Sequence, residues 1–276
     1  MLFLPGNTPN MLINGDTLGA DTVIFDLEDA VSPDEKDAAR ILVRNARKYQ
    51  NFSGCEVVVG INPKDTEFWK EDLDAVIPLK PDMIMPTKVS GGEMIREVSA
   101  YMGQVEERRG IEKGSVKILP LIETALGVEK AYEIASSDVR VAGLFLGGED
   151  FTADMHCKRT KEGQEIFYAR TRLVCAARAC GIEAYDTPFT DVEDMEGLRK
   201  DTEFAKSLGF AGKAVISPRH VDIGNEVFSP TEAEIEYAHD VMDAIEDGKR
   251  QGKGVISLRR KRVDAPIVKR AKTGRE

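Results

Sequence analysis

Residues 144–151 read Leu-Phe-Leu-Gly-Gly-Glu-Asp-Phe, and this stretch decides the fold. An apolar run typical of a buried strand ends in two glycines, and the carboxylates Glu149 and Asp150 follow directly. Glycine allows the backbone to turn sharply and to approach a ligand closely. The two carboxylates are therefore expected at the end of a strand, where α/β enzymes keep their chemistry.

One strand–helix unit earlier, residues 118–124 read Ile-Leu-Pro-Leu-Ile-Glu-Thr and end in a single acid, Glu123. Acids at the ends of two neighbouring strands favour a magnesium site, because Mg²⁺ takes one or two protein carboxylates and leaves its other positions to water and substrate. The alternative is that each acid only caps the helix that follows it. Because an acid follows each of two successive strands, we favour the metal site.

Length and composition limit the possible classes of protein. The 276 residues can bury one large core, and α/β barrels often have this size. We expect no membrane span, because no apolar run reaches roughly 18 residues, and no signal peptide at residues 1–6. The formal charge of −10 argues against nucleic-acid binding. Cysteines at positions 55, 157, 175 and 180 lack metal-type spacing, so we expect reduced thiols and a cytoplasmic location.

Strand and helix signals alternate along the chain. Strands are predicted at 1–4, 22–25, 56–61, 82–85, 116–122, 141–146, 183–185 and 212–216. Helices are predicted after residue 8 or 9, from the capping sequence Ser32-Pro33-Asp34-Glu35, and at 90–109, 126–136, 162–179 and 192–208. This alternation predicts an α/β protein with a TIM (β/α)₈ barrel rather than an open sheet. No Gly-x-Gly-x-x-Gly follows the first strand, which weakens a dinucleotide-binding alternative.

Polar residues gather just after the predicted strands, as a barrel active site requires. They are Asp26, Glu28, Asp29, Asn62, Lys88, Glu123, Glu149, Asp150, Asp186 and Arg219. The tail differs in kind, so the expected domains are a barrel over residues 1–230 and a C-terminal helix with an extended arm over residues 231–276. Asp264 stands between Val263 and Ala265 in that arm, which predicts an arm that covers the active site of its own chain or of a neighbour.

Nine motifs together resemble the citrate lyase β-subunit family, which consists of citryl-thioester lyases of the HpcH/HpaI aldolase superfamily. They lie at residues 2–7, 25–31 (with Glu35, Lys36 and Arg40), 121–123, 148–151, 159–163, 169–170, 209–213, 217–219 and 263–266. The resemblance extends in order over essentially the whole chain. The Arg-Thr-Lys-Glu-Gly motif at 159–163 favours this family over the related citramalyl-CoA and malyl-CoA lyases.

The resemblance implies retro-Claisen cleavage of a citryl thioester, on an acyl-carrier protein or on coenzyme A, to oxaloacetate and an acetyl thioester. It implies Mg²⁺ on Glu123 and Asp150, metal-bound waters on Glu28 and Asp29, and Asp264 as the acid that protonates the enolate. The substrate-binding residues implied are Lys88, Asn62, Arg219 and Arg170, where Arg170 either meets a phosphate of the thioester arm or lies on an ion-paired helix face. The implied assembly is a homotrimer, with carrier and transferase subunits as further partners.

Two departures from the family pattern limit what the resemblance implies. No arginine precedes the opening strand, and Gly60 stands where relatives carry an arginine that clamps a substrate carboxylate. Such a charge-assisted pair is worth roughly 1.5–3 kcal/mol. Unless Lys88 or Arg219 replaces it, a stand-alone citramalyl-CoA or malyl-CoA lyase, a related thioesterase, or a non-catalytic scaffold subunit remains an alternative.

Overall fold

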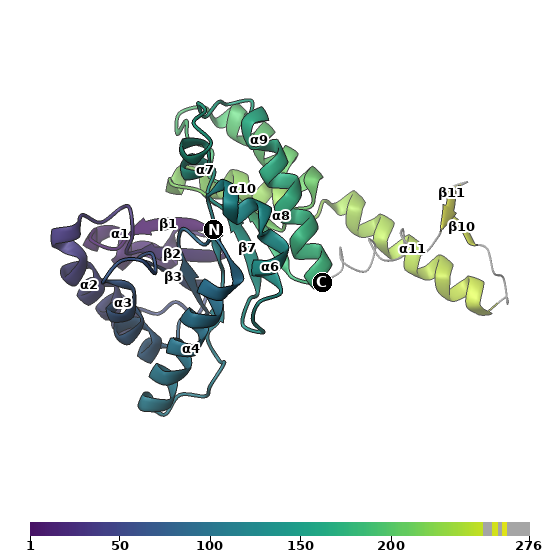
Figure 1. Cartoon of the computed structure of the whole chain (residues 1–276). Coiled ribbons are helices and arrows are strands. Elements are labelled where there is room, and N and C mark those ends of the chain that lie inside the picture. Colours follow the sequence, from purple (N-terminus) through teal and green to yellow (C-terminus); the bar gives the residue numbers. More distant parts are fainter. Residues whose placement is uncertain (251–255, 259–260, 264–276) are drawn as a thin grey trace. The chain divides into compact units, whose positions relative to one another are not determined.

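The structure is a computed structural model that describes residues 1–250, 256–258 and 261–263 (Figure 1). The chain divides into two compact units, Met1–Val227 and Phe228–Glu276. No helix in the described part of the chain is long and apolar enough to cross a membrane.

The first unit is built on a ring of parallel strands. One sheet contains β1 (Leu2–Pro5), β2 (Thr22–Asp26), β3 (Glu56–Ile61), β4 (Met83–Pro86) and β5 (Lys117–Ile118) in that order, and the other contains β6 (Leu121–Ile122), β7 (Gly143–Leu146), β8 (Glu183–Asp186) and β9 (Gly212–Lys213). Parallel bridges join the sheets on both sides, Ile118 with Val141 and Leu2 with Val215. The ring closes through these bridges, and the predicted TIM-type barrel is confirmed.

The strands β5 and β6 are two halves of the single strand predicted at 116–122. Proline has no backbone N–H, so it interrupts a strand's ladder of hydrogen bonds. The interruption lies at Pro120, but hydrogen bonds to the strands on either side still hold the segment. Leu119 N donates to Ile84 O at 2.9 Å, and Phe145 N donates to Pro120 O at 3.0 Å. If β5 and β6 are counted as one strand, that strand joins the two sheets, and the barrel has eight strands.

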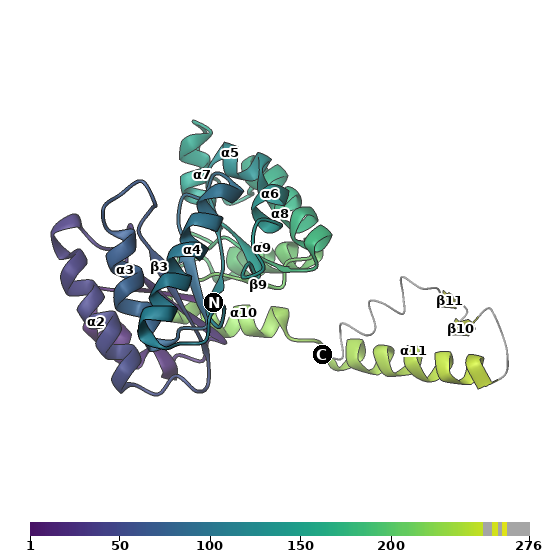
Figure 2. The same ribbon diagram turned by 60° about the horizontal axis from the view of Figure 1, so that its bottom comes forward.

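The helices lie outside the strands (Figures 1 and 2). They are α1 (Pro9–Asn14), α2 (Lys36–Tyr49), α3 (Trp69–Val76), α4 (Gly92–Arg109), α5 (Ala125–Glu129), α6 (Ala131–Ala135), α7 (Gly148–Asp154), α8 (Phe167–Cys180), α9 (Met195–Leu208) and α10 (Val221–Phe228). Ser32 stands at the predicted N-cap position, but the first turn at 33–35 is a 3₁₀ turn that precedes α2, and the Ser32 side chain makes no capping bond. The helix predicted at 162–179 ends at Cys180, before Gly181, whose left-handed backbone has a φ of 72°.

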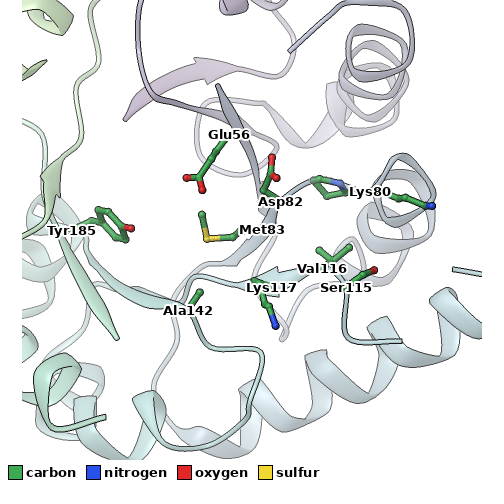
Figure 3. A pocket seen from close by; sticks show the side chains of 10 residues that line it. Glu56, Lys80, Asp82, Met83, Ser115, Val116, Lys117, Ala142 and Tyr185 are labelled. Carbon is green, nitrogen blue, oxygen red and sulfur yellow. The ribbon is translucent and has the colours of Figure 1, made fainter. Parts of the chain in front are cut away.

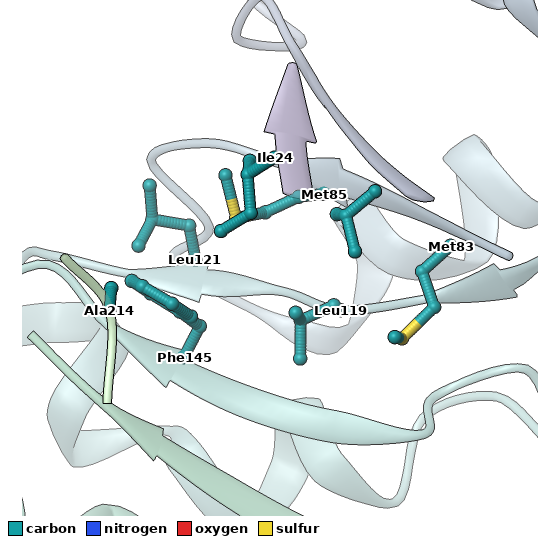
Figure 4. Packing of buried hydrophobic residues seen from close by; sticks show 8 residues of the cluster. Ile24, Met83, Met85, Leu119, Leu121, Phe145 and Ala214 are labelled. Carbon is teal, nitrogen blue, oxygen red and sulfur yellow. The ribbon is translucent and has the colours of Figure 1, made fainter. Parts of the chain in front are cut away.

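Apolar side chains from the strands fill the centre of the barrel (Figure 4). This barrel core consists of Ile24, Val58, Met83, Met85, Leu119, Leu121, Phe145 and Ala214. Alternate residues of a strand face the same side, so the positions two residues beyond a core residue also face inward. Asp26, Gly60, Glu123 and Gly147 follow the core residues Ile24, Val58, Leu121 and Phe145 in this way. The core therefore supports a ring of small and acidic residues at the carboxyl ends of the strands.

A cavity of about 390 Å³ opens at the other end of the barrel (Figure 3). Its lining includes Glu56, Met83 and Lys117, the first residues of β3, β4 and β5, together with Tyr185. The cavity therefore lies at the amino ends of the strands, and the barrel core separates it from the carboxylates.

The second unit contains α11 (Glu232–Arg250) and two short antiparallel strands, β10 (Ile256–Leu258) and β11 (Lys261–Val263), in which Ile256 pairs with Val263. The helix agrees with the one predicted for the tail. Asp264 lies outside the described residues.

Candidate active site

Lys88 forms ion pairs or a hydrogen bond with four acidic residues at the carboxyl ends of the strands. Its ammonium group forms an ion pair with Glu28 and lies 3.3 Å from Asp29 Oδ2 and 3.6 Å from Asp150 Oδ2. Its backbone N–H donates to Glu123 Oε1 at 2.7 Å. Five residues predicted from the sequence, on three separate strand ends and the start of a helix, are therefore brought together around one cation.

The backbone of Lys88 is unusual, because its φ of 52° lies in the left-handed region. This conformation costs a side-chain-bearing residue roughly 1–2 kcal/mol, since Cβ crowds the carbonyl oxygen. In it, the N–H of Lys88 meets Glu123 while the side chain meets Glu28. Strain of this kind is typical of functional sites, where the surrounding structure fixes the residue.

Glu123 is almost fully enclosed, with 4% of its surface exposed. Burial, followed by the charge of Asp150, raises the pKa of the Glu123 carboxyl to about 9. Gly147 makes this position possible, because a Cβ there would lie 2.6 Å from Glu123 Cβ and 2.7 Å from Glu123 Oε2. Glu123 is thus a carboxyl group that needs an additional positive charge to ionise readily at neutral pH.

Asp150 lies in the first turn of α7, and its Oδ2 atom is buried without a hydrogen-bond partner in the described structure. A carboxylate oxygen that has no hydrogen bond, beside a second buried carboxylate, is a donor set that suits a hard cation. Within the described residues, no three His, Cys, Asp or Glu side chains are grouped as a metal cage. A cation on Glu123 and Asp150 would complete its shell with water or substrate oxygens, as Mg²⁺ commonly does.

The loop that carries Glu28 is fixed by hydrogen bonds with Asp26 and with the buried Lys36. The Asp26 carboxylate accepts from the N–H groups of Glu28 and Ala30 at 2.7 and 3.2 Å. The buried ammonium of Lys36 donates to the carbonyls of Leu27 and Glu28, each at 2.7 Å. Burial raises the pKa of Glu28 to about 7, although Lys88 opposes this shift. The sequence indicated Lys36 only as part of a family motif and not as the residue that holds this loop.

The structure corrects the expected role of Arg170. Its side chain is fully buried between α8, α9 and the end of β8, where it binds Asp186 at 2.9 Å and Asp201 at 2.8 Å. Lys213 joins both aspartates at 2.6 Å. The predicted contact with a thioester phosphate is wrong because no solvent reaches the guanidinium, and the alternative of an ion-paired residue holds. Asp186, also predicted at the active-site end, belongs to this network.

We expect Arg170→Met to destabilise the fold by about 3–5 kcal/mol, because two buried aspartates would then share only Lys213. Urea unfolding monitored by circular dichroism measures the change. Arg178→Met is a matched control on the same helix, since the pair of Arg178 with Glu183 at 2.7 Å is about half exposed. An exposed pair contributes about 0–1 kcal/mol. Equal losses in the two variants would contradict the assignment of Arg170 to the fold.

Two other predicted substrate-binding residues have partners outside the acid cluster. Asn62 is 3% exposed, and its side-chain amide donates to Asp72 Oδ2 at 2.7 Å, which ties the end of β3 to α3. Arg219 is exposed on the turn after β9 and pairs with Glu193 at 2.7 Å. Neither has a hydrogen bond or ion pair with the four acids in the described structure. Of the predicted substrate-binding residues, Lys88 alone contacts those acids.

Comparisons with known proteins identify the family of this chain. The model of the HpcH/HpaI aldolase/citrate lyase family matches residues 1–218. A citrate lyase subunit beta from Leuconostoc mesenteroides subsp. cremoris is 44% identical over 271 residues, 98% of this chain and 90% of the relative. Among solved structures, the protein CitE from Mycobacterium tuberculosis in complex with magnesium, acetoacetate and coenzyme A matches with a TM-score of 0.79 at 26% identity, over 99% of this chain and 95% of that one. The citrate lyase beta subunit complexed with oxaloacetate and magnesium, from the same organism, matches with a TM-score of 0.71 at 27% identity, over 83% and 96%.

Proposed function

Since this chain belongs to the HpcH/HpaI aldolase/citrate lyase family, we propose that it is a magnesium-dependent lyase that cleaves a citryl thioester to oxaloacetate and an acetyl thioester. The observation that carries the proposal is that the buried Glu123 lies beside Asp150, one oxygen of which is buried without a hydrogen bond. One similar solved structure holds magnesium, acetoacetate and coenzyme A, and another holds magnesium and oxaloacetate. These ligands support the same metal and substrate class for this chain.

The reaction is a retro-Claisen cleavage. The tertiary hydroxyl of the citryl group loses its proton, and the bond between the hydroxyl-bearing carbon and the carbon next to the thioester breaks. The electron pair of that bond leaves as a thioester enolate, while the hydroxyl-bearing carbon becomes the keto carbon of oxaloacetate. The enolate then takes a proton at carbon. Bound Mg²⁺ supplies a Lewis acid and a template for the substrate oxygens.

Each acid has a separate proposed task. Glu123 and Asp150 hold the metal, and Glu28 and Asp29 bind its waters and so orient it. Lys88 offsets the repulsion between the acids, and its ammonium can donate to a substrate carboxylate because the side chain is 40% exposed. The proton for the enolate must come from another acid, for which we propose Asp264. A homotrimer and a cytoplasmic location remain predictions, as do the carrier and transferase subunits.

The function is tested by measuring oxaloacetate release from citryl-coenzyme A and from citryl carrier protein. Malate dehydrogenase reduces the oxaloacetate, and the loss of NADH absorbance gives the rate. Turnover that stops on removal of Mg²⁺ by EDTA and returns on its addition supports the proposal. Release of pyruvate from citramalyl-coenzyme A, with no oxaloacetate from either citryl thioester, would indicate a stand-alone lyase. Absence of any cleavage would favour the scaffold alternative.

Gly60 tests how the substrate is held. We expect Gly60→Arg to increase kcat/KM for the citryl thioester by about one to two decades, because it restores a carboxylate clamp worth roughly 1.5–3 kcal/mol. A Cβ at this position would lie 3.2 Å from Met85 Cε and 3.5 Å from Asp26 Oδ1, so the flexible Met85 must shift slightly. Steady-state kinetics measures the effect, and Gly60→Met controls for bulk. A strong decrease for Gly60→Arg alone would mean that the pocket is built around glycine for another substrate.

A further inference from the structure

The start of α7 is hydrogen-bonded to Thr187, which directly follows the neighbouring strand β8. Gly148 is the first residue of this helix, and its N–H donates to Thr187 Oγ1 at 2.9 Å. The first N–H groups of a helix have no acceptor within the helix itself. A Cβ on Gly148 would lie 2.8 Å from Thr187 Oγ1, so the two residues are in direct contact. Asp150 lies two residues further along the same turn.

Thr187 itself is fixed by the buried charge network. Its carbonyl accepts from Lys213 Nζ at 2.6 Å, and the same ammonium binds Asp186 and Asp201. Thr187 is 1% exposed, and threonine side chains have few rotamers because they branch at Cβ. The hydroxyl that meets Gly148 is therefore held in one place by contacts on the outer side of β8 and β9.

The other end of α7 is bonded to the start of α5, just after Glu123. Asp154 Oδ2 accepts from the N–H of Ala125, two residues after Glu123, at 2.7 Å. Gly147 packs directly against Glu123 at the start of the helix. The separation between the carboxylates of Glu123 and Asp150 consequently depends on where α7 begins.

We propose that Thr187 is a positioning residue for the metal site, which sets the place of Asp150 relative to Glu123 through its hydrogen bond with the Gly148 N–H. This inference rests on the proposed function for the presence of a metal on those two carboxylates. Removal of a residue that orients a metal ligand, without binding the metal itself, typically lowers metal affinity by roughly 10–100-fold.

The test is a calorimetric titration with Mg²⁺ alone on the full chain. Thr187→Val keeps the shape of the side chain but removes the acceptor, and we expect it to weaken Mg²⁺ binding by roughly 10-fold or more. Thr187→Ser keeps the acceptor and is expected to retain the wild-type affinity. Thr202→Val is the matched control, because the buried Thr202 hydroxyl donates only to Leu198 O, at 2.7 Å, within α9. It should lower Tm without changing Mg²⁺ affinity.

A second set of variants covers the case in which Thr187→Val does not fold. Gly148→Ala leaves every polar group in place but pushes against Thr187, so it should also weaken Mg²⁺ binding. Thr187→Ala removes the two nearest atoms, at 2.8 and 3.0 Å, and should reduce the additional effect of Gly148→Ala. Additive effects in that double variant, or equal affinity in Thr187→Val and wild type, would overturn the positioning role alone. Absence of Mg²⁺ binding by the wild type would overturn the proposed function and the role of Thr187 together.

Discussion

Asp150→Ala is expected to lower Mg²⁺ affinity by on the order of 100-fold or more and to leave citryl-thioester cleavage at background. Asp150 supplies one of only two proposed protein ligands, so the cation would keep a single carboxylate, that of Glu123, whose pKa is raised mainly by burial. Calorimetry with Mg²⁺, in the presence of oxaloacetate, measures the affinity, and oxaloacetate release measures the reaction.

Glu149→Ala provides the matched control for this loss. Glu149 is the preceding carboxylate in the same helical turn, but it is directed to Arg159, whose Nε lies 3.5 Å from Glu149 Oε1. Its loss should leave Mg²⁺ affinity within about threefold of the wild type, since the metal keeps both proposed ligands. The assignment fails if Asp150→Ala binds Mg²⁺ as tightly as the wild-type protein does.

Asp264→Ala is the second substitution expected to abolish turnover, and it should leave Mg²⁺ binding nearly intact. The enolate needs a proton at carbon, and Glu123 and Asp150 cannot supply one while they hold a metal as carboxylates. Asp264 stands between apolar residues in a tail that follows the completed barrel, where shielding would help it to keep a proton. Truncation before Val255 should have the same effect.

Subunit mixing tests whether Asp264 acts on a neighbouring chain. Inactive Asp264→Ala and inactive Asp150→Ala chains, unfolded and reassembled together, should regain part of the activity. A site made of one chain's intact carboxylates and its neighbour's intact Asp264 would again be complete. Reassembled Asp264→Ala alone is the control. Verified mixed oligomers that stay inactive would show that Asp264 acts within its own chain or is not the acid.

Local sequence signals predicted most of the barrel and the centre of the candidate site. Apolar runs of strand length, each ending in a polar residue, placed Glu28, Lys88 and Glu123 at the same end of the barrel, because parallel strands share their direction. The Gly-Gly-Glu-Asp sequence similarly predicted where Asp150 would lie. These features depend on neighbouring residues in one segment, which sequence patterns describe well.

Features that depend on contacts between distant segments could not be predicted in the same way. Arg170 carries one charge on a helix with arginines on several faces, and only the packing of α8 on β8 shows that it faces Asp186 and Asp201. Thr187 follows the strand predicted at 183–185, but no residue near it in the sequence indicates its partner Gly148, which lies 39 positions earlier. The buried Lys36 likewise bonds to carbonyl groups, which every residue possesses.

The closing bridge between Leu2 and Val215 has a consequence for how this protein is made. Phe3 N donates to Val215 O at 3.0 Å and Val215 N to Met1 O at 2.8 Å, while the Met1 amino group reaches Lys213 O, 212 positions along the chain. Translation at roughly 5–20 residues per second separates the synthesis of these segments by about 10–40 s. During that interval one edge of β1 has no partner, and an unpaired edge strand is a template for association with other chains. Aggregation is therefore most probable on the ribosome, before the last strand is made, and chaperone binding to the nascent chain should matter more for the yield of this protein than the stability of the finished barrel.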